Sequence, residues 1–186
     1  MKKWVTAAVA FTAVSVAFAE GFVKSGGVGR LAIVDTYGAP VEAVHRASQK
    51  MENLLMISVA AEKGKWSFAS AKESFDAAKA TAAVFLVKDP TLPMSLVAME
   101  SKWGVVNAEG LDGKGVEKEI LRVATIVLGG ASSKYSASSM RPVFAPADIS
   151  KAGEIITFDS LMSIVSYLPE MGFKQFTLEP KDKDGE

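Results

Sequence analysis

The sequence predicts an α/β (α+β) fold, in which a mixed, mainly parallel sheet of about four to five strands is packed by about three to four helices. Short apolar segments alternate with amphipathic helical segments, which favours parallel strand pairs. Two later extended segments close together in the sequence predict an antiparallel edge hairpin. The 186 residues are 49% hydrophobic and 23% charged, which is typical of a single globular domain.

Residues 1–19 have the pattern of a secretory signal peptide. Lys2 and Lys3 form its charged start, residues 5–17 form an apolar run, and the small-x-small cleavage pattern ends at Ala19. The apolar run is shorter than the about 20 residues of a membrane-spanning helix. We therefore expect cleavage after Ala19 and a secreted or periplasmic mature chain. An uncleaved N-terminal anchor is the alternative.

The remaining chain is predicted to contain one domain with short extensions. Residues 20–29 predict a flexible glycine-rich lead-in, residues 30–178 a single globular domain, and residues 179–186 a charged tail. Without Lys2 and Lys3, 19 basic residues face 21 acidic ones, a formal charge of about −2. This balance argues against nucleic acid and against a basic membrane patch as partners. The sequence predicts no oligomeric state.

The first half of the domain predicts three strands and two helices. Residues 30–36, 56–60 and 82–87 are short apolar runs of strand type. Residues 41–54 and 67–80 place apolar side chains at helical spacing. Because the last strand is apolar throughout, we expect it inside the sheet with both faces covered.

The second half begins with the predicted hairpin, formed by residues 95–99 and 103–107. A third helix follows at residues 116–128, with apolar residues on most sides, so we expect it to be largely buried. Gly129 or Gly130 is predicted to end this helix with a left-handed cap.

The chain then becomes polar and irregular. Residues 131–139 ("ASSKYSASS") predict a small polar loop, and residues 140–149 predict an extended segment broken by prolines. A last helix is predicted at residues 158–168, with Pro169 ending it.

The residue inventory excludes several chemistries. The chain has no cysteine and one histidine, His45, inside the first predicted helix. Thiol nucleophiles, cysteine-bound metals, and zinc sites of three histidines or of two histidines and a glutamate are therefore excluded within one chain. No G-x-S-x-G elbow accompanies His45, which is predicted to be a surface or core-edge residue. We predict no catalytic residue, no metal site and no cofactor.

Carboxylates are the remaining acid–base candidates. Asp35 and Asp89 end the first and third strands, where ligand sites of α/β sheets lie, and are candidate cleft acids. Capping of the adjacent turns is the alternative for both. Glu119, on the third helix, is expected to be a solvated or capping acid. Trp66 and Trp103 are expected in the core or, as the alternative, lining a pocket.

The segment from residue 82 to residue 168 resembles the archaemetzincin branch of the zincin metallopeptidases. It has a strand, a hairpin ending in "WGVVNAEGL", and a buried helix that closes on glycine. In that fold a mixed sheet packs on the helix that bears the zinc ligands, and an antiparallel edge strand borders the substrate cleft. The family motif is H-E-x-x-H-x-x-G-x-x-H followed by a Met-turn.

The residues that carry zinc chemistry in this family are missing here. With Gly129 on the motif glycine, the positions of His, Glu, His and His hold Arg122, Val123, Ile126 and Ser132. With Gly130 there instead, they hold Val123, Ala124, Val127 and Ser133. Met140 matches the methionine of the Met-turn. Because neither alignment keeps a zinc ligand or the general base, the resemblance implies the fold and not the peptidase activity.

We therefore expect an exported domain without catalytic activity that keeps a peptidase-like cleft and binds a peptide or an envelope protein. The exposed edge of the predicted hairpin suits strand addition by such a partner. One alternative is a carboxylate-dependent hydrolase that uses Asp35 and Asp89. Another is a structural or assembly component of the cell envelope.

Overall fold

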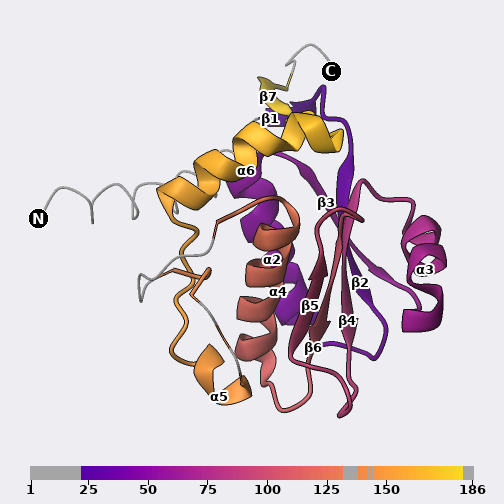
Figure 1. Cartoon of the computed structure of the whole chain (residues 1–186). Coiled ribbons are helices and arrows are strands. Elements are labelled where there is room, and N and C mark those ends of the chain that lie inside the picture. The colour runs from indigo at the N-terminus through magenta and orange to yellow at the C-terminus, as the bar shows by residue number, and fades with distance from the viewer. Residues whose placement is uncertain (1–21, 132–137, 142, 144, 182–186) are drawn as a thin grey trace, which may run out of the picture.

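A five-stranded mixed sheet forms the centre of the fold in the computed structural model, which describes residues 22–131, 138–141, 143 and 145–181 (Figure 1). The strand order is β3-β2-β4-β6-β5. The strands are β2 (Arg30–Asp35), β3 (Ser58–Lys63), β4 (Ala82–Val87), β5 (Ser95–Ala98) and β6 (Trp103–Asn107). β3, β2, β4 and β6 pair in parallel, and β5 pairs antiparallel with β6. This confirms the predicted fold class and the edge hairpin.

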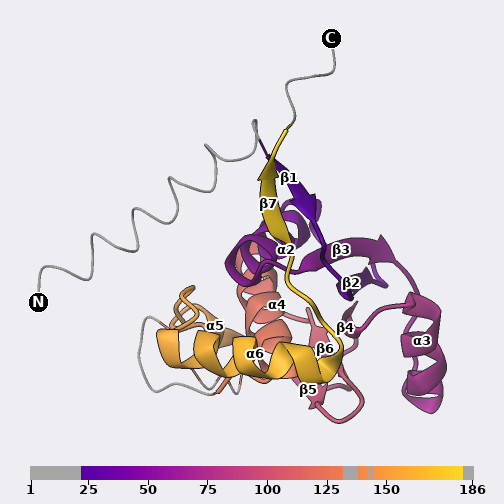
Figure 2. The same cartoon turned by 90° about the horizontal axis from the view of Figure 1, so that it is seen from above.

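Helices cover the two faces of the sheet unequally. The helices are α2 (Val41–Leu55), α3 (Ala71–Ala78), α4 (Gly113–Val127), α5 (Pro146–Ile149) and α6 (Phe158–Met171), with a short 3-10 turn η1 (Phe68–Ser70). α2 and α4 lie against one face, α3 lies on the other, and α6 crosses the end of α4 (Figures 1 and 2). The main apolar core therefore lies between the sheet and the α2, α4 and α6 layer, and a smaller apolar cluster lies under α3.

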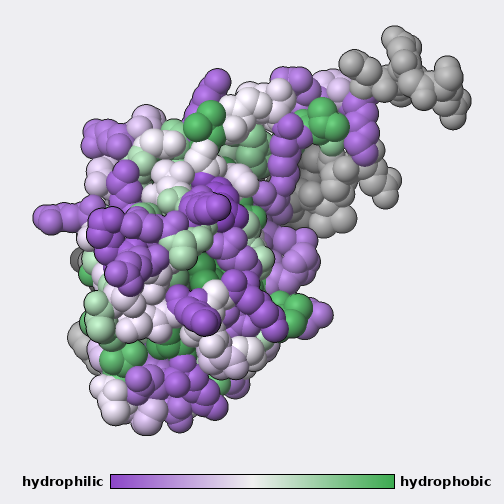
Figure 3. Space-filling view, turned by 90° about the vertical axis from the view of Figure 1, so that its right-hand side faces the viewer, coloured by the Kyte–Doolittle hydropathy of each residue, from purple (hydrophilic) through white to green (hydrophobic). Residues whose placement is uncertain are grey.

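The central strand β4 is buried at every residue, as its continuous apolar sequence predicts. Its alternate side chains supply both cores: Val84 and Leu86 belong to the main core, and Phe85 belongs to the smaller cluster. The side of the molecule that carries α3 is dominated by hydrophilic residues, with hydrophobic ones scattered among them (Figure 3). No helix of the described residues is both long and apolar enough to span a membrane.

The two ends of the described chain pair with each other, which the sequence does not predict. β1 (Phe22–Ser25) and β7 (Thr177–Pro180) form an antiparallel ribbon inside the expected flexible lead-in and across the start of the expected tail. Neither strand alternates apolar and polar residues in a way that indicates a strand, because most of their side chains are exposed. Residues 1–21, which include the predicted signal peptide, and residues 182–186 lie outside the described residues.

Several element boundaries differ from the prediction because of local capping. β3 begins at Ser58 rather than residue 56, because Met56 takes a left-handed conformation that ends α2. α4 begins three residues early, at Gly113, because the Asp112 carboxylate accepts a 2.7 Å hydrogen bond from the N–H of Gly115.

The later helices differ in the same way. α3 is shorter than predicted, because η1 replaces its first turn and Lys79 takes a left-handed conformation at its end. α5 lies in the segment predicted to be extended. α6 continues past Pro169 to Met171, and Gly172 caps it by donating its N–H to the carbonyl of Pro169. The helix predicted at residues 158–168 therefore ends three residues later than expected.

Candidate functional site

Among the helices of the described residues, α4 has the most buried residues, and several of these are charged. Twelve of its fifteen residues are buried. Four of these buried residues are charged: Glu117, Lys118, Glu119 and Arg122. A buried charge costs several kcal/mol unless it is paired and hydrogen-bonded, so the partners of these four groups define what α4 does.

Glu119 and Arg122 form a buried ion pair that reaches the edge strand β5. Arg122 Nε donates to Glu119 Oε2 at 2.8 Å, and Nη2 donates to Glu119 Oε1. The same Nη2 donates to the hydroxyl of Ser95 on β5 at 2.5 Å. The side chains are 0% (Glu119) and 10% (Arg122) exposed. We call Glu119, Arg122 and Ser95 the polar brace, because they tie α4 to β5.

The position of Glu119 corrects the sequence analysis, which expects a solvated or capping acid there. Arg122 lies one turn further along the same helix, so its guanidinium neutralises the carboxylate without leaving α4. Two of the three guanidinium nitrogens of Arg122, Nε and Nη2, donate hydrogen bonds within the polar brace. Nη1 donates to no partner among the described residues.

Glu117 ties α4 to α2 in a second ion-paired cluster. Its carboxylate accepts from Arg46 Nε at 2.8 Å and from Lys50 Nζ at 2.5 Å. Burial raises the pKa of Glu117, but the hydrogen bonds from Lys50 and Arg46 outweigh this and hold the pKa below its ordinary value. Lys50 also contacts Glu154 at 3.3 Å, which extends the cluster to the segment before α6.

Lys118 holds the segment that follows α5. Its ammonium donates to the carbonyl oxygens of Ala152 at 2.7 Å, Ile149 at 3.3 Å and Ser150 at 3.4 Å. Glu117 thus contacts α2, and Lys118 contacts the end of α5 and the segment after it. Glu119 is linked to β5 through Arg122. The buried charged residues of α4 therefore link this helix to the elements packed around it.

The other motif positions are apolar or structural. Val123 packs under β6, where a Cβ added to Gly104 would lie 2.5 Å from its Cγ1. Ile126 is half-buried. Gly129 has a φ of +88° and takes the left-handed position that the sequence assigns to Gly129 or Gly130. A Cβ at Gly129 would also lie 2.7 Å from the ring of Tyr167 on α6.

Met140 lies in a tight turn. The N–H of Arg141 donates to the carbonyl of Ser138 at 3.3 Å, and the N–H of Met140 donates to the hydroxyl of Ser138 at 3.0 Å. Met140 is 2% exposed. A Met-turn requires such a buried methionine, although an ordinary core methionine would be buried as well. Ser132, and Ser133 of the alternative alignment, lie outside the described residues.

The residues of α4 do not fit the zinc site of the family that the sequence resembles. Protein zinc ligands are imidazole, thiolate and carboxylate groups. The three described motif positions hold the guanidinium of Arg122, which is occupied by Glu119, and the aliphatic side chains of Val123 and Ile126. Across the described residues, no group of three or more histidine, cysteine, aspartate or glutamate residues is placed to hold a metal ion.

The two candidate cleft acids each hold the turn that follows their strand. Asp35 Oδ1 accepts hydrogen bonds from the backbone N–H groups of residues 37, 38 and 39, at 3.1, 2.9 and 2.9 Å. Asp89 Oδ1 accepts from the hydroxyl and the N–H of Thr91, at 2.6 and 2.8 Å. These bonds hold the pKa of Asp89 below its ordinary value. The contacts favour the capping alternative for both residues.

The remaining candidates from the sequence have ordinary surroundings. His45 is exposed on α2, as predicted. The Trp66 ring lies 4.8 Å from that of Trp103 and 4.6 Å from that of Phe85, between centroids, in the apolar cluster under α3. This supports the core alternative for the two tryptophans.

Fold and site together define a mixed α/β scaffold with a buried Glu119–Arg122 ion pair on its central helix. Among solved structures, the chain is similar to archaemetzincin from Methanopyrus kandleri, with a TM-score of 0.61 and 14% identity, over 76% of this chain and 96% of that chain. It is also similar to a zinc-dependent peptidase from Methanocorpusculum labreanum (strain Z), with a TM-score of 0.53 and 8% identity, over 72% and 99% of the two chains. No protein-family model matches the chain, and no curated protein matches it. At these identities the likeness shows the fold alone, and it confirms the predicted resemblance at that level.

Proposed function

We propose that this chain is an exported, non-catalytic domain that uses a zincin-like scaffold to bind a peptide or an envelope protein along strand β5. The observation that carries the proposal is the polar brace. It places a hydrogen-bonded Glu119–Arg122 pair on the helix that bears the metal in zincins, and it joins that pair to the edge strand through Ser95. A scaffold that keeps the edge strand without the metal ligands retains the means to bind rather than to hydrolyse.

The outer edge of β5, which pairs with no strand within the described residues, supports strand addition. Asn107 N–H donates to the carbonyl of Met94, which fixes the hydrogen-bonded register between β5 and β6. Because successive residues of a strand point their backbone groups to opposite edges, those of Ser95 and Val97 point away from β6. An extended peptide can pair with these groups. Nη1 of Arg122 has no partner among the described residues and could donate to a carbonyl oxygen of such a peptide.

A binding experiment with a double variant tests this proposal. Peptides selected by display on the mature chain (residues 20–186) would be titrated against the wild type and against Glu119→Met/Arg122→Met. Replacing both charges avoids leaving one of them buried and unpaired, so the variant should fold. We expect its affinity to fall by about tenfold, the value of one lost charge-assisted hydrogen bond. If the folded double variant binds these peptides with unchanged affinity, then the polar brace is not part of the binding site.

The assembly alternative also has an observation in its favour. Phe158 and Met162 on α6 are 72% and 51% exposed, and Ile155 before the helix is 54% exposed. Large exposed apolar side chains at helical spacing are typical of contact surfaces. If α6 is an assembly surface, then Phe158→Ser/Met162→Ser should abolish a self-association that sedimentation detects in the wild type. A wild type that is monomeric at high concentration would argue against this alternative.

A further inference from the structure

We propose, on the basis of the binding function proposed above, that Asn107 is a positioning residue for peptide binding at β5. Its side chain holds the loop that leads into this strand. β5 has four residues, is half-buried throughout, and pairs with β6 alone among the described strands. A short edge strand with few buried contacts opens more readily than the centre of a sheet. The groups that hold its ends therefore decide how well its binding edge is ordered.

The side chain of Asn107 has both of its amide donors and its acceptor oxygen occupied. Oδ1 accepts from the N–H of Asp89 at 3.1 Å and from the N–H of Glu109 at 3.2 Å. Nδ2 donates to the carbonyl oxygens of Asp89 at 2.7 Å and Leu92 at 2.9 Å. Three of these bonds hold the loop between β4 and β5. Asn107 is 3% exposed, so water cannot readily replace them.

The backbone of Asn107 fixes the start of the edge strand itself. Its N–H donates to the carbonyl of Met94 at 2.8 Å. The next residue, Ser95, is the first residue of β5 and belongs to the polar brace. Asn107 therefore holds the chain up to the residue before Ser95. This arrangement keeps the outward backbone groups of Ser95 and Val97 in place for an added strand.

The far end of β5 has a separate anchor. Lys102, in the turn between β5 and β6, donates its N–H to the carbonyl of Met99 at 2.9 Å. Its ammonium donates to the carbonyl of Met171, the last residue of α6, at 3.0 Å. Neither bond involves Asn107. Loss of the Asn107 amide should therefore loosen the loop and the start of β5 and leave the turn at the far end in place.

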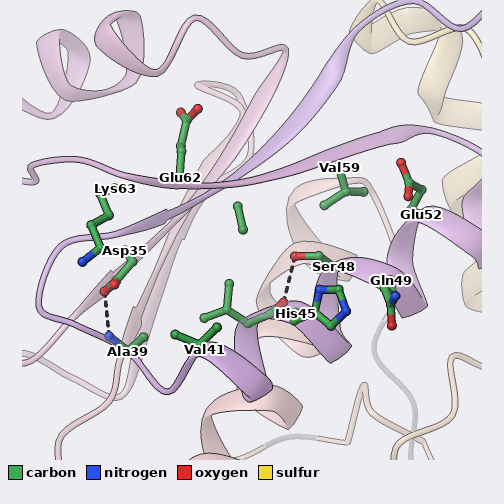
Figure 4. A pocket seen from close by; sticks show the side chains of 12 residues that line it. Asp35, Ala39, Val41, His45, Ser48, Gln49, Glu52, Val59, Glu62 and Lys63 are labelled. Atoms are coloured by element: carbon green, nitrogen blue, oxygen red, sulfur yellow. Dashed lines mark hydrogen bonds between the residues drawn. The ribbon is translucent and has the colours of Figure 1, made fainter.

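A comparison within the same sheet separates this role from the capping of turns in general. Asp35, at the end of β2, also holds the turn that follows it, and its carboxylate accepts from the N–H of Ala39 at 2.9 Å (Figure 4). That turn leads into α2, whereas the loop held by Asn107 leads into β5. Asp35→Ala should therefore loosen a turn of the same kind without changing the affinity for a peptide at β5.

Binding of a fluorescein-labelled peptide to the mature chain, measured by fluorescence anisotropy at neutral pH, tests this role. The probe is the tightest-binding peptide of the display selection described above. Asn107→Asp keeps an oxygen for the two N–H groups and loses both bonds to loop carbonyls. The start of β5 would then become ordered only on binding, so we expect the affinity to fall by about tenfold or more, which corresponds to ordering one or two residues.

Gln175→Glu is the control matched in chemistry. Gln175 also has a carboxamide that donates to a backbone carbonyl, that of Leu55 at the end of α2, at 2.6 Å. The substitution adds the same negative charge far from β5 in the sequence and outside its sheet. Gln175→Glu and Asp35→Ala should both bind the peptide within about twofold of the wild type, because neither changes the loop before β5.

Amide hydrogen exchange distinguishes positioning from a general loss of stability. In free Asn107→Asp, the N–H groups of residues 92 and 107 should exchange faster than in the wild type, and that of Lys102 should exchange at the same rate. In the wild type, peptide binding should slow exchange at Ser95 and Val97 and leave Leu92 almost unchanged, because the loop is already ordered. The wild-type measurement keeps the role of Asn107 testable if Asn107→Asp does not fold.

The outcomes separate the role of Asn107 from the binding function. Wild-type affinity in a folded Asn107→Asp variant, or an equal loss of affinity in either control, would overturn the role of Asn107 alone. Strong slowing of exchange at Leu92 when the wild type binds would do the same, because the loop would then become ordered only on binding. A wild type that binds no selected peptide, or binds one without protecting Ser95 and Val97, would overturn the binding function at β5 and the role of Asn107 with it.

Discussion

Removing Arg122 alone should destabilise the fold severely, because it leaves the Glu119 carboxylate without a partner. Glu119 is 0% exposed, and both of its oxygens accept hydrogen bonds from Arg122. Removing one member of a buried pair costs about 3–5 kcal/mol, because an uncompensated charge stays inside the protein. For a domain of this size, Arg122→Met should therefore lower the Tm by about 6–20 °C.

Urea denaturation followed by circular dichroism measures this loss, and two further variants make the result interpretable. In Glu119→Met/Arg122→Met both charges are gone, so most of the stability should return. Lys114→Met is the control for an exposed ion pair, because it removes the pair with Glu154, in which Lys114 is 68% exposed. Its free energy of unfolding should fall by less than about 1 kcal/mol. If Arg122→Met costs no more than Lys114→Met, or if the double variant is as unstable as the single one, then the brace does not hold α4 in place.

Two further predictions concern α4. The pKa of Glu117 is lowered in the folded state, so its contribution to stability is present above the pKa of the unfolded chain and is lost as the pH falls through the folded value. The urea midpoint should therefore decrease as the pH falls below about 4.5. Glu117→Gln should make the midpoint less dependent on pH in this range. If the substitution leaves the pH dependence of the midpoint unchanged, this prediction is contradicted. Gly129→Ala should destabilise the fold by more than about 1 kcal/mol, because the position has a positive φ and the new Cβ meets Tyr167. Lys79→Ala is the control, because Lys79 also takes a left-handed conformation at a helix end and already has a side chain. This variant should change the free energy of unfolding little. If both variants lose the same stability, the contact with Tyr167 is not the cause of the loss at Gly129.

The parts of the fold that the sequence predicts well are those in which burial gives a clear pattern. β4 and β6 have the predicted bounds because runs of apolar residues mark strands that pack on both faces. The β1–β7 ribbon could not be predicted, because its strands are short, mostly exposed and about 150 residues apart. The start of β3 and the end of α6 depend on single capping residues, Met56 and Gly172, which take left-handed conformations.

Only part of the candidate site could be predicted from the sequence. The apolar residues of positions 116–128 predicted a largely buried helix, which α4 confirms. The assignment of Arg122, Val123 and Ile126 to zinc-motif positions stays a prediction. The resemblance did not identify Ser95, which lies 27 residues before Arg122. The signal that was available is the spacing of Glu119 and Arg122, three residues apart in a helix with apolar residues on most sides. An acid and a base at that spacing among buried positions indicate an internal ion pair rather than a solvated face.

The most direct test of the account is zinc binding by the purified mature chain. After incubation with excess zinc and desalting, elemental analysis should find far less than one zinc ion per chain. In the predicted motif alignment a guanidinium and two aliphatic groups stand at positions of zinc donors and the general base, and no described cluster of three or more histidine, cysteine or acidic residues can hold a metal ion. Peptide cleavage should be absent and insensitive to a chelator. One tightly bound zinc ion per chain, with peptide cleavage that a chelator stops, would contradict the proposal that this chain is a non-catalytic domain without a zinc site.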